Sequence, residues 1–252
     1  MKKMRLFAFT TLALLNLSSV ANADTPILLS DDLVGISFQL VSLGCLAATV
    51  FFLLERGNVP SSWRVSITVA GLVTGVTFIH YLYMGKVWNI TGVMPTVHRY
   101  VEWLITMPLL ILQFYFILKA AGKRNSKVFW RLLISSIAMV VGGYLGEANY
   151  IPSILGFIIC TVAWIYILYE VFSGDAGKIA LKIRDKAFVN AFNVMRVIVT
   201  VGWAIYPLGY ALNHLTSGIE LNAIYNLADF LNKIIFSLII YVAATQHTSR
   251  PR

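Results

Sequence analysis

Long apolar segments recur along the chain, and short polar connections separate them. Most are about 20 residues long, the length with which an α-helix crosses the roughly 30 Å hydrocarbon core of a bilayer. The fourth is shorter, and we expect it to begin earlier, near Phe129. The pattern therefore predicts an all-α membrane protein, a seven-transmembrane helix bundle with no room for a second domain. The seven predicted spans are residues 33–54, 65–84, 100–118, 132–146, 151–172, 188–212 and 221–244.

Composition excludes an ordinary water-soluble protein. Of the 252 residues, 58% are hydrophobic and 12% are charged, whereas soluble domains carry about 25% charged residues. The formal net charge is +9, but the basic residues lie in the connections between spans, so no nucleic-acid partner is expected. Cys45 and Cys160 both lie in apolar runs, which predicts neither a disulfide framework nor a metal site.

The first 23 residues have the features of a secretory signal peptide. A basic start is followed by a short apolar stretch and then by Ala21-Asn22-Ala23, a small-residue pattern typical of cleavage sites. An uncleaved first helix is the alternative, but about ten apolar residues are too few to cross a bilayer. We therefore predict a signal peptide over residues 1–23 and one membrane domain over residues 24–252.

The distribution of Lys and Arg predicts the orientation. Thirteen basic residues flank one set of span ends, whereas only Lys86 and Arg99 flank the other. Cytoplasmic connections retain positive charge during insertion. The amino terminus is therefore expected outside and the carboxyl terminus in the cytoplasm.

The seventh predicted span contains two ionisable residues, Asp229 and Lys233. Lys233 lies near the middle of the span, and Asp229 precedes it by four residues on the same helical face. A charge at mid-membrane is costly and is a functional candidate by default. One interpretation is an internal ion pair; the other is a desolvated amine that forms a Schiff base with a carbonyl compound.

The third predicted span carries one polar stripe. Its members recur at spacings that place them within about 60° of one another around a helix. Carboxylates near a protonated Schiff base would stabilise it, so Glu102 and Asp229 could serve this role while Arg99 balances the surplus. The alternative is a hydrated contact between two helices with no further role, which does not explain why the stripe would face a buried lysine. The stripe consists of Arg99, Glu102, Thr106 and Gln113.

Aromatic residues gather within the spans. Trp203, Tyr206 and Tyr210 repeat at helical spacing, and Pro207 can bend the sixth helix. Such stripes are more often core than ligand site, but here they could enclose a long, flat, apolar ligand. Tyr81, Trp103 and Trp164 complete the set.

Three motifs together closely resemble the microbial rhodopsins, and specifically the proteorhodopsins. They are residues 99–106 (RYVEWLIT), 203–207 (WAIYP) and 225–233 (YNLADFLNK). The resemblance covers essentially the whole chain after residue 23. It implies seven helices around all-trans retinal, which is bound to Lys233, with Glu102 as proton acceptor and Asp229 as second counterion. It also implies a histidine, His80, that hydrogen-bonds the acceptor and tunes its proton affinity.

Several positions depart from the family pattern. Glu102 stands where relatives usually have Asp, and Gln113 stands where pumping relatives carry a carboxylic proton donor. Because Gln cannot release a proton, we expect slow return of the proton to the Schiff base, slower still as pH rises. Leu110 implies green absorption, and Phe157 fills the position that is Gly in relatives with a carotenoid antenna. A pentamer or hexamer is expected, although Gln39 replaces a Trp of the usual protomer contact.

The resemblance favours a light-driven outward proton pump of the bacterial inner membrane over any enzyme. A slow-cycling photosensor with weak or no transport is the alternative, which the missing donor at Gln113 favours; it would signal through a transducer or through its own oligomer. An anion pump conflicts with the negative charge of Glu102, and a sodium pump conflicts with Thr106, where such relatives use a carboxylate. A seven-helix receptor without a chromophore would leave Lys233 without a role.

Overall fold

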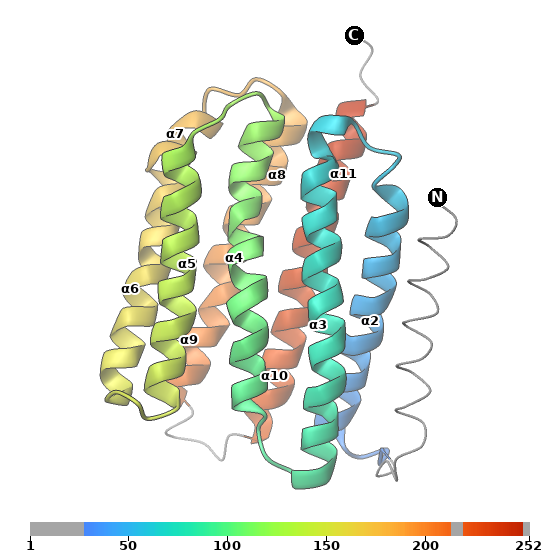
Figure 1. The fold of residues 1–252 in the computed structure, drawn as a ribbon, viewed down its shortest axis with the longest axis vertical. Coiled ribbons are helices and arrows are strands. Elements are labelled where there is room, and N and C mark those ends of the chain that lie inside the picture. Colours follow the sequence, from blue (N-terminus) through green and yellow to red (C-terminus); the bar gives the residue numbers. More distant parts are fainter. Residues whose placement is uncertain (1–27, 213–218, 249–252) are drawn as a thin grey trace.

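The computed structural model describes residues 28–212 and 219–248 and contains seven helices long and apolar enough to cross a membrane (Figure 1). This confirms the predicted bundle; the predicted signal peptide lies outside the described residues. The first five spans are α2 (Leu33–Glu55), α3 (Arg64–Thr91), α4 (Thr96–Ala120), α5 (Ser126–Glu147) and α6 (Ser153–Phe172). The sixth combines α8 (Lys186–Val197), the π-helix η2 (Ile198–Gly202) and α9 (Trp203–Leu212), and the seventh combines α10 (Ile219–Phe230), the π-helix η3 (Leu231–Ile235) and α11 (Phe236–Thr248). Two short elements, η1 (Ser61–Trp63) and α7 (Asp175–Ala180), precede α3 and α8.

Capping residues explain where two observed spans differ from the predicted ones. The second span continues past Met84 to Thr91, where Gly92 ends it with the left-handed φ of 63°, a conformation that glycine adopts without strain. The fourth span begins at Ser126, earlier than expected, because the Asn125 side chain accepts a hydrogen bond from the backbone N–H of Lys127. Such a cap satisfies one of the helix's unpaired donors.

The seven spans form a closed bundle. Each span packs against the next along the chain, and α10 packs against α2, which joins the last span to the first. The most buried of the spans in the described residues is α4. Polar residues on α4 therefore face neighbouring helices rather than lipid.

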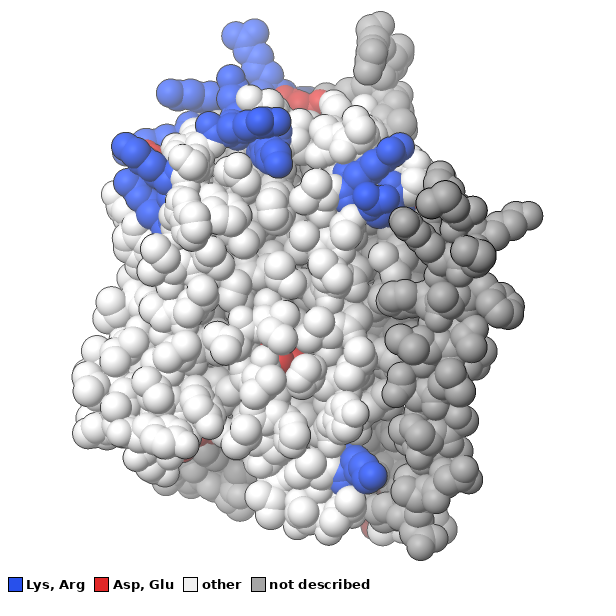
Figure 2. Space-filling model, viewed as in Figure 1, with Lys and Arg blue, Asp and Glu red and all other residues white. Residues whose placement is uncertain are grey.

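The outer surface is suited to a bilayer. Large apolar side chains such as Leu33, Leu40 and Val201 are exposed along the spans, and Figure 2 shows a broad belt of mostly uncharged side chains, with a small acidic spot near its middle. Lys and Arg gather at one end of the bundle (Figure 2), which is the upper end in Figure 1. We call this the basic end; its described cations are Arg56, Arg64, Lys119, Lys123, Arg124, Lys127, Arg131, Lys178, Lys182, Arg184 and Lys186.

The two π-helical segments η2 and η3 contact each other inside the bundle. A π-turn shifts the backbone hydrogen bonds from i→i+4 to i→i+5, so local carbonyls become available to side chains. The carbonyl of Val199 accepts a bond of 3.0 Å from Trp164 Nε1, and that of Gly202 accepts one of 3.0 Å from Asn232 Nδ2. These bonds fix the indole of Trp164 and link the sixth span to the seventh.

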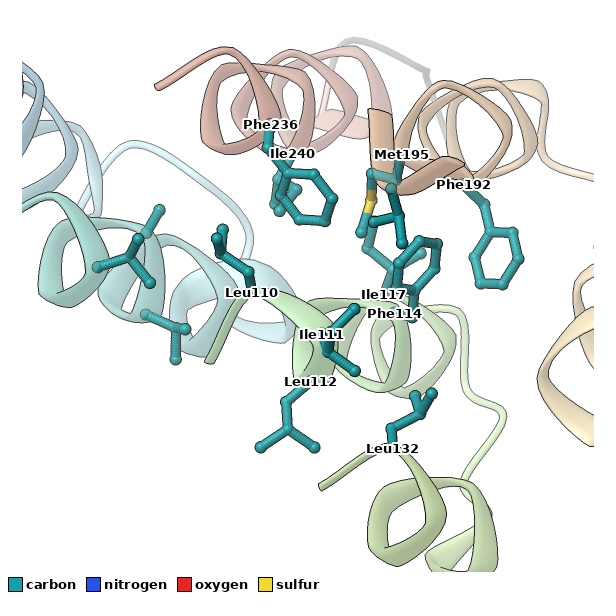
Figure 3. Close-up of a cluster of buried hydrophobic side chains, with 14 of the residues drawn as sticks. Leu110, Ile111, Leu112, Phe114, Ile117, Leu132, Phe192, Met195, Phe236 and Ile240 are labelled. Atoms are coloured by element: carbon teal, nitrogen blue, oxygen red, sulfur yellow. The ribbon is translucent and has the colours of Figure 1, made fainter. Parts of the chain in front are cut away.

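An apolar layer fills the half of the bundle nearer the basic end. Its side chains are almost entirely buried, from 0 to 1% exposed, and they extend from α4, α8 and α11 toward one another (Figure 3). Because α11 follows Lys233, the layer lies between that residue and the basic end. The layer consists of Leu110, Phe114, Ile117, Phe192, Met195, Phe236 and Ile240.

Candidate functional site

Lys233 lies at the centre of η3 and is fully buried. Its Nζ lies 2.7 Å from Oε2 of Glu102 on α4 and 2.9 Å from Oδ2 of Asp229 on α10. The two carboxylates carry one more charge than the ammonium balances. The predicted juxtaposition of these three residues is therefore present in the structure.

Asp229 accepts hydrogen bonds from three aromatic side chains. The hydroxyls of Tyr81 and Tyr206 donate to its two oxygens at 2.6 Å each, and the indole Nε1 of Trp103 lies 3.3 Å from both. Hydrogen bonds to the charged form of a carboxylate favour that form. These three side chains hold the Asp229 carboxylate in a fixed position.

The carboxylate of Glu102 has fewer hydrogen-bond donors around it than that of Asp229. Apart from Lys233, the described side chain that hydrogen-bonds its carboxylate is Thr77 of α3, whose Oγ1 donates to Oε1 at 2.7 Å. The Thr106 hydroxyl donates at 3.0 Å to the backbone carbonyl of Glu102 rather than to its carboxylate. Sequence analysis missed Thr77, although it lies four residues before Tyr81 and therefore on the same helical face.

Arg99 supplies the balancing positive charge and is 1% exposed. One guanidinium nitrogen lies 3.9 Å from Asp229 Oδ2, and the other donates to the amide oxygens of Asn222 at 3.2 Å and Asn226 at 2.9 Å. The asparagines were also missed. Their positions, together with those of Asp229 and Lys233, follow a helical spacing that marks a second polar stripe, on the last span.

Among the described residues, His80 forms no hydrogen bond with Glu102. Its Nδ1 lies 3.2 Å from the backbone carbonyl of Val76, one turn earlier on α3. The hydrogen-bond position on Glu102 that the resemblance implied for His80 is taken instead by Thr77, which projects from α3 toward α4. A role for His80 in tuning the acceptor stays a prediction.

Gln113 is fully buried at the level of the apolar layer. Its Nε2 donates to the backbone carbonyl of Ser66 at 3.0 Å. Its Oε1, the Ser66 hydroxyl and the Ser237 hydroxyl have no partner among the described residues. The position predicted for an internal proton donor thus holds an amide that cannot titrate.

The predicted aromatic residues surround a cavity beside the buried lysine. Trp103 and Tyr206 form part of its wall and also contact Asp229, which places the cavity next to Lys233. Tyr81 and Leu110 are not among the wall residues: Tyr81 bonds Asp229, and Leu110 belongs to the apolar layer. The predicted residues that do line the cavity are Trp103, Trp164, Trp203, Tyr206, Pro207 and Tyr210.

This lining suits a flat apolar molecule attached to the lysine. The walls also include Met107, Met139 and Val140, and the indole Nε1 of Trp203 is buried without a hydrogen-bond partner among the described residues. The Lys233 ammonium occupies the place that a positively charged linkage nitrogen would take, with its counter-charges in contact. The residues present therefore fit a retinal covalently bound at Lys233.

Fold and site together define a class: an α-helical membrane protein of seven spans, built around a buried lysine that is paired with carboxylates and bordered by an aromatic cavity. Within that class, the chain belongs to the bacteriorhodopsin-like family. The family model described as "Bacteriorhodopsin-like protein" matches residues 32–247. Retinal binding and proton transport are typical of this family.

Individual relatives narrow the similarity to proteorhodopsins. The chain is 48% identical to a blue-light absorbing proteorhodopsin of Gamma-proteobacterium Hot 75m4, over 86% of this chain and 88% of the relative. It is equally, 48%, identical to a green-light absorbing proteorhodopsin of Gamma-proteobacterium EBAC31A08, over 87% and 90%. The crystal structure of a blue light-absorbing proteorhodopsin from Med12 superposes with a TM-score of 0.74 at 49% identity, over 85% of this chain and 98% of that one. The chain is accordingly a light-driven rhodopsin.

Proposed function

We propose that this protein is a light-driven outward proton pump that binds all-trans retinal through a Schiff base at Lys233. When bound, retinal supplies the absorption of visible light and an isomerisation that changes the direction of the Lys233 nitrogen. The observation that carries the proposal is a fully buried amine 2.7 Å from one carboxylate and 2.9 Å from another. An ion pair with no function is a costly use of a bilayer interior, because apolar residues would be cheaper there.

The two carboxylates are proposed to differ in role. Asp229 accepts bonds from two hydroxyls and an indole, which stabilise its charge, and it remains ionised. Glu102 is held by a single hydroxyl besides the lysine, so it is the carboxylate that accepts the proton from Nζ of Lys233. Its extra methylene relative to Asp retains the acid while changing its reach.

The surroundings give the transfer a direction. The apolar layer separates Lys233 from the basic end, whereas Arg99, Asn222 and Asn226 form a polar route toward the opposite end. A proton held at Glu102 therefore leaves most readily away from the basic end. Since positive charge is retained in the cytoplasm, we place the basic end there and assign outward transport across a bacterial inner membrane.

A photosensor is the second candidate, and Gln113 is the observation that favours it. Because Gln113 cannot titrate and lies within the apolar layer, the return of a proton to Nζ depends on water that crosses this layer. A long-lived deprotonated state could then signal to a transducer. We retain a pentameric or hexameric assembly as part of the proposal, on the family resemblance.

Light-driven acidification of an unbuffered cell suspension tests the pump. We expect illuminated cells to acidify the medium, and a protonophore to abolish the signal. Glu102→Gln should keep a visible pigment but stop acidification, whereas the control Glu55→Gln, which changes a carboxylate at the basic end, should pump normally. A bleachable pigment without acidification would refute the pump and support the sensor.

A further inference from the structure

A second cavity lies at the basic end, outside the site described above. It holds about 300 Å³, and its walls come from three parts of the chain: the α4–α5 connection, the α7–α8 connection and the last turn of α11. It is therefore a place where one ligand could contact all three. Its lining residues are Ala120, Ala121, Lys123, Lys182, Ile183, Arg184, Asp185, Phe188 and His247.

Three cations converge on this cavity, namely Lys123, Lys182 and Arg184. Within residues 28–212 and 219–248, none of their side chains forms an ion pair or a hydrogen bond. Retention of positive charge on the cytoplasmic side explains how many cations the basic end carries. This retention does not explain why three unpaired cations line a single concave surface.

The carboxylate in the wall offsets only part of this charge. Asp185 caps α8, and its Oδ1 accepts the backbone N–H of Ala187 at 2.8 Å. The start of α8 adds the partial positive charge of a helix amino terminus at the same place. The cavity thus presents a net positive surface.

His247 adds a fixed hydrogen-bond donor. Its Nδ1 accepts the indole N–H of the buried Trp63 at 3.2 Å, and its ring packs edge-on against Phe188 at 5.2 Å. Because Nδ1 is the acceptor, the neutral ring carries its hydrogen on Nε2. The cavity therefore combines three cations with an imidazole ring that is held in place by two aromatic neighbours.

We propose that this cavity binds a phosphate group, supplied either by an anionic phospholipid of the adjacent leaflet or by free inorganic phosphate. The planar Arg184 guanidinium can engage two phosphate oxygens at once, and the two lysines provide point charges. A bound phosphate would join the two connections to the end of α11. This inference does not depend on the pump, since it concerns none of the residues around Lys233.

Native mass spectrometry of the purified full chain tests the proposal. The chain is titrated separately with phosphatidylglycerol, phosphatidylcholine and inorganic phosphate. The cavity variant combines Lys123→Gln, Lys182→Gln and Arg184→Gln. The control variant makes the same change in charge at three exposed cations of the same end that do not line the cavity, Arg124→Gln, Lys127→Gln and Lys178→Gln.

We expect the control variant to bind phosphatidylglycerol or phosphate as tightly as the wild type does. The cavity variant should bind about 100-fold more weakly, at about 1 kcal/mol for each cation lost. If the triple variant does not fold, Arg184→Gln alone should weaken binding about fivefold. Binding of one ligand but not the other identifies the source. No saturable binding, equal losses in both variants, or phosphatidylcholine binding as tight as phosphatidylglycerol would overturn the proposal.

Discussion

Gln113→Glu introduces a carboxyl group between Lys233 and the basic end. The side chain is fully buried, and its amide nitrogen donates to Ser66 O at 3.0 Å. A protonated glutamic acid can make the same bond through its hydroxyl. Burial in the apolar layer disfavours the carboxylate, so the variant should rest in the protonated form that a proton donor requires.

The size of the effect follows from the position of the residue. Gln113 lies eleven residues beyond Glu102 on α4, which is about 16 Å along the helix axis. A proton must therefore cross the apolar layer through water and not by direct contact. A positioned acid typically accelerates proton transfer by about 10²–10⁴-fold; with this separation we expect about 10²-fold.

Flash photolysis over a range of pH values provides the assay. In the wild type, the return of the proton to Lys233 should slow in proportion to the falling hydrogen-ion concentration. In Gln113→Glu it should be about 10²-fold faster and nearly independent of pH while the carboxyl remains protonated. Gln113→Leu, which has similar size and no acid, should keep the wild-type dependence. A wild-type rate that is fast and indifferent to pH would refute the reasoning.

Three further outcomes are expected. Lys233→Ala should abolish the visible pigment after incubation with retinal, and borohydride should fix retinal to the Lys233 peptide of the wild type; label on another peptide would contradict the assignment. Thr77→Val removes the hydrogen-bond donor to buried Glu102 and should lower the free energy of unfolding by about 1–3 kcal/mol, measured as a lower midpoint of thermal bleaching. In the control Thr68→Val, the lost hydrogen bonds are exposed, so the free energy of unfolding should change by under about 0.5 kcal/mol. Asn232→Leu removes the hydrogen bond between the two π-segments. It should lower the free energy of unfolding by about 1 kcal/mol in the same assay and retain the colour of the pigment; an unchanged midpoint would show that the bond to Gly202 contributes nothing.

Much of the bundle could be predicted because membrane spans have a strong and simple signal. Apolar length located all seven spans, and the stripe from Arg99 to Gln113 correctly assigned the buried face of α4. Lys233 and its two carboxylates were found because ionisable residues inside a bilayer are rare. Orientation depends on charge alone and stays a prediction.

Details that depend on packing between helices could not be predicted in the same way. The π-segments at Ile198–Gly202 and Leu231–Ile235 depend on packing between spans. In the first of them, the carbonyls of Val199 and Gly202 accept bonds from side chains of other spans. Thr77 is one hydroxyl among several on α3, and only its position opposite Glu102 distinguishes it. The family pattern assigned the contact with Glu102 to His80, whereas this backbone presents Thr77 instead.

The apolar layer also determines where the membrane voltage acts. An apolar region of low polarity carries most of the electric field, while a polar region next to it is close to the potential of its own aqueous side. Moving one elementary charge through the whole voltage takes about 2.3 kcal/mol per 100 mV. In a pump with this layer between Lys233 and the basic end, most of that electrical work falls on proton uptake rather than on release, so a hyperpolarised cell should slow the recovery of the resting state far more than the initial transfer to Glu102.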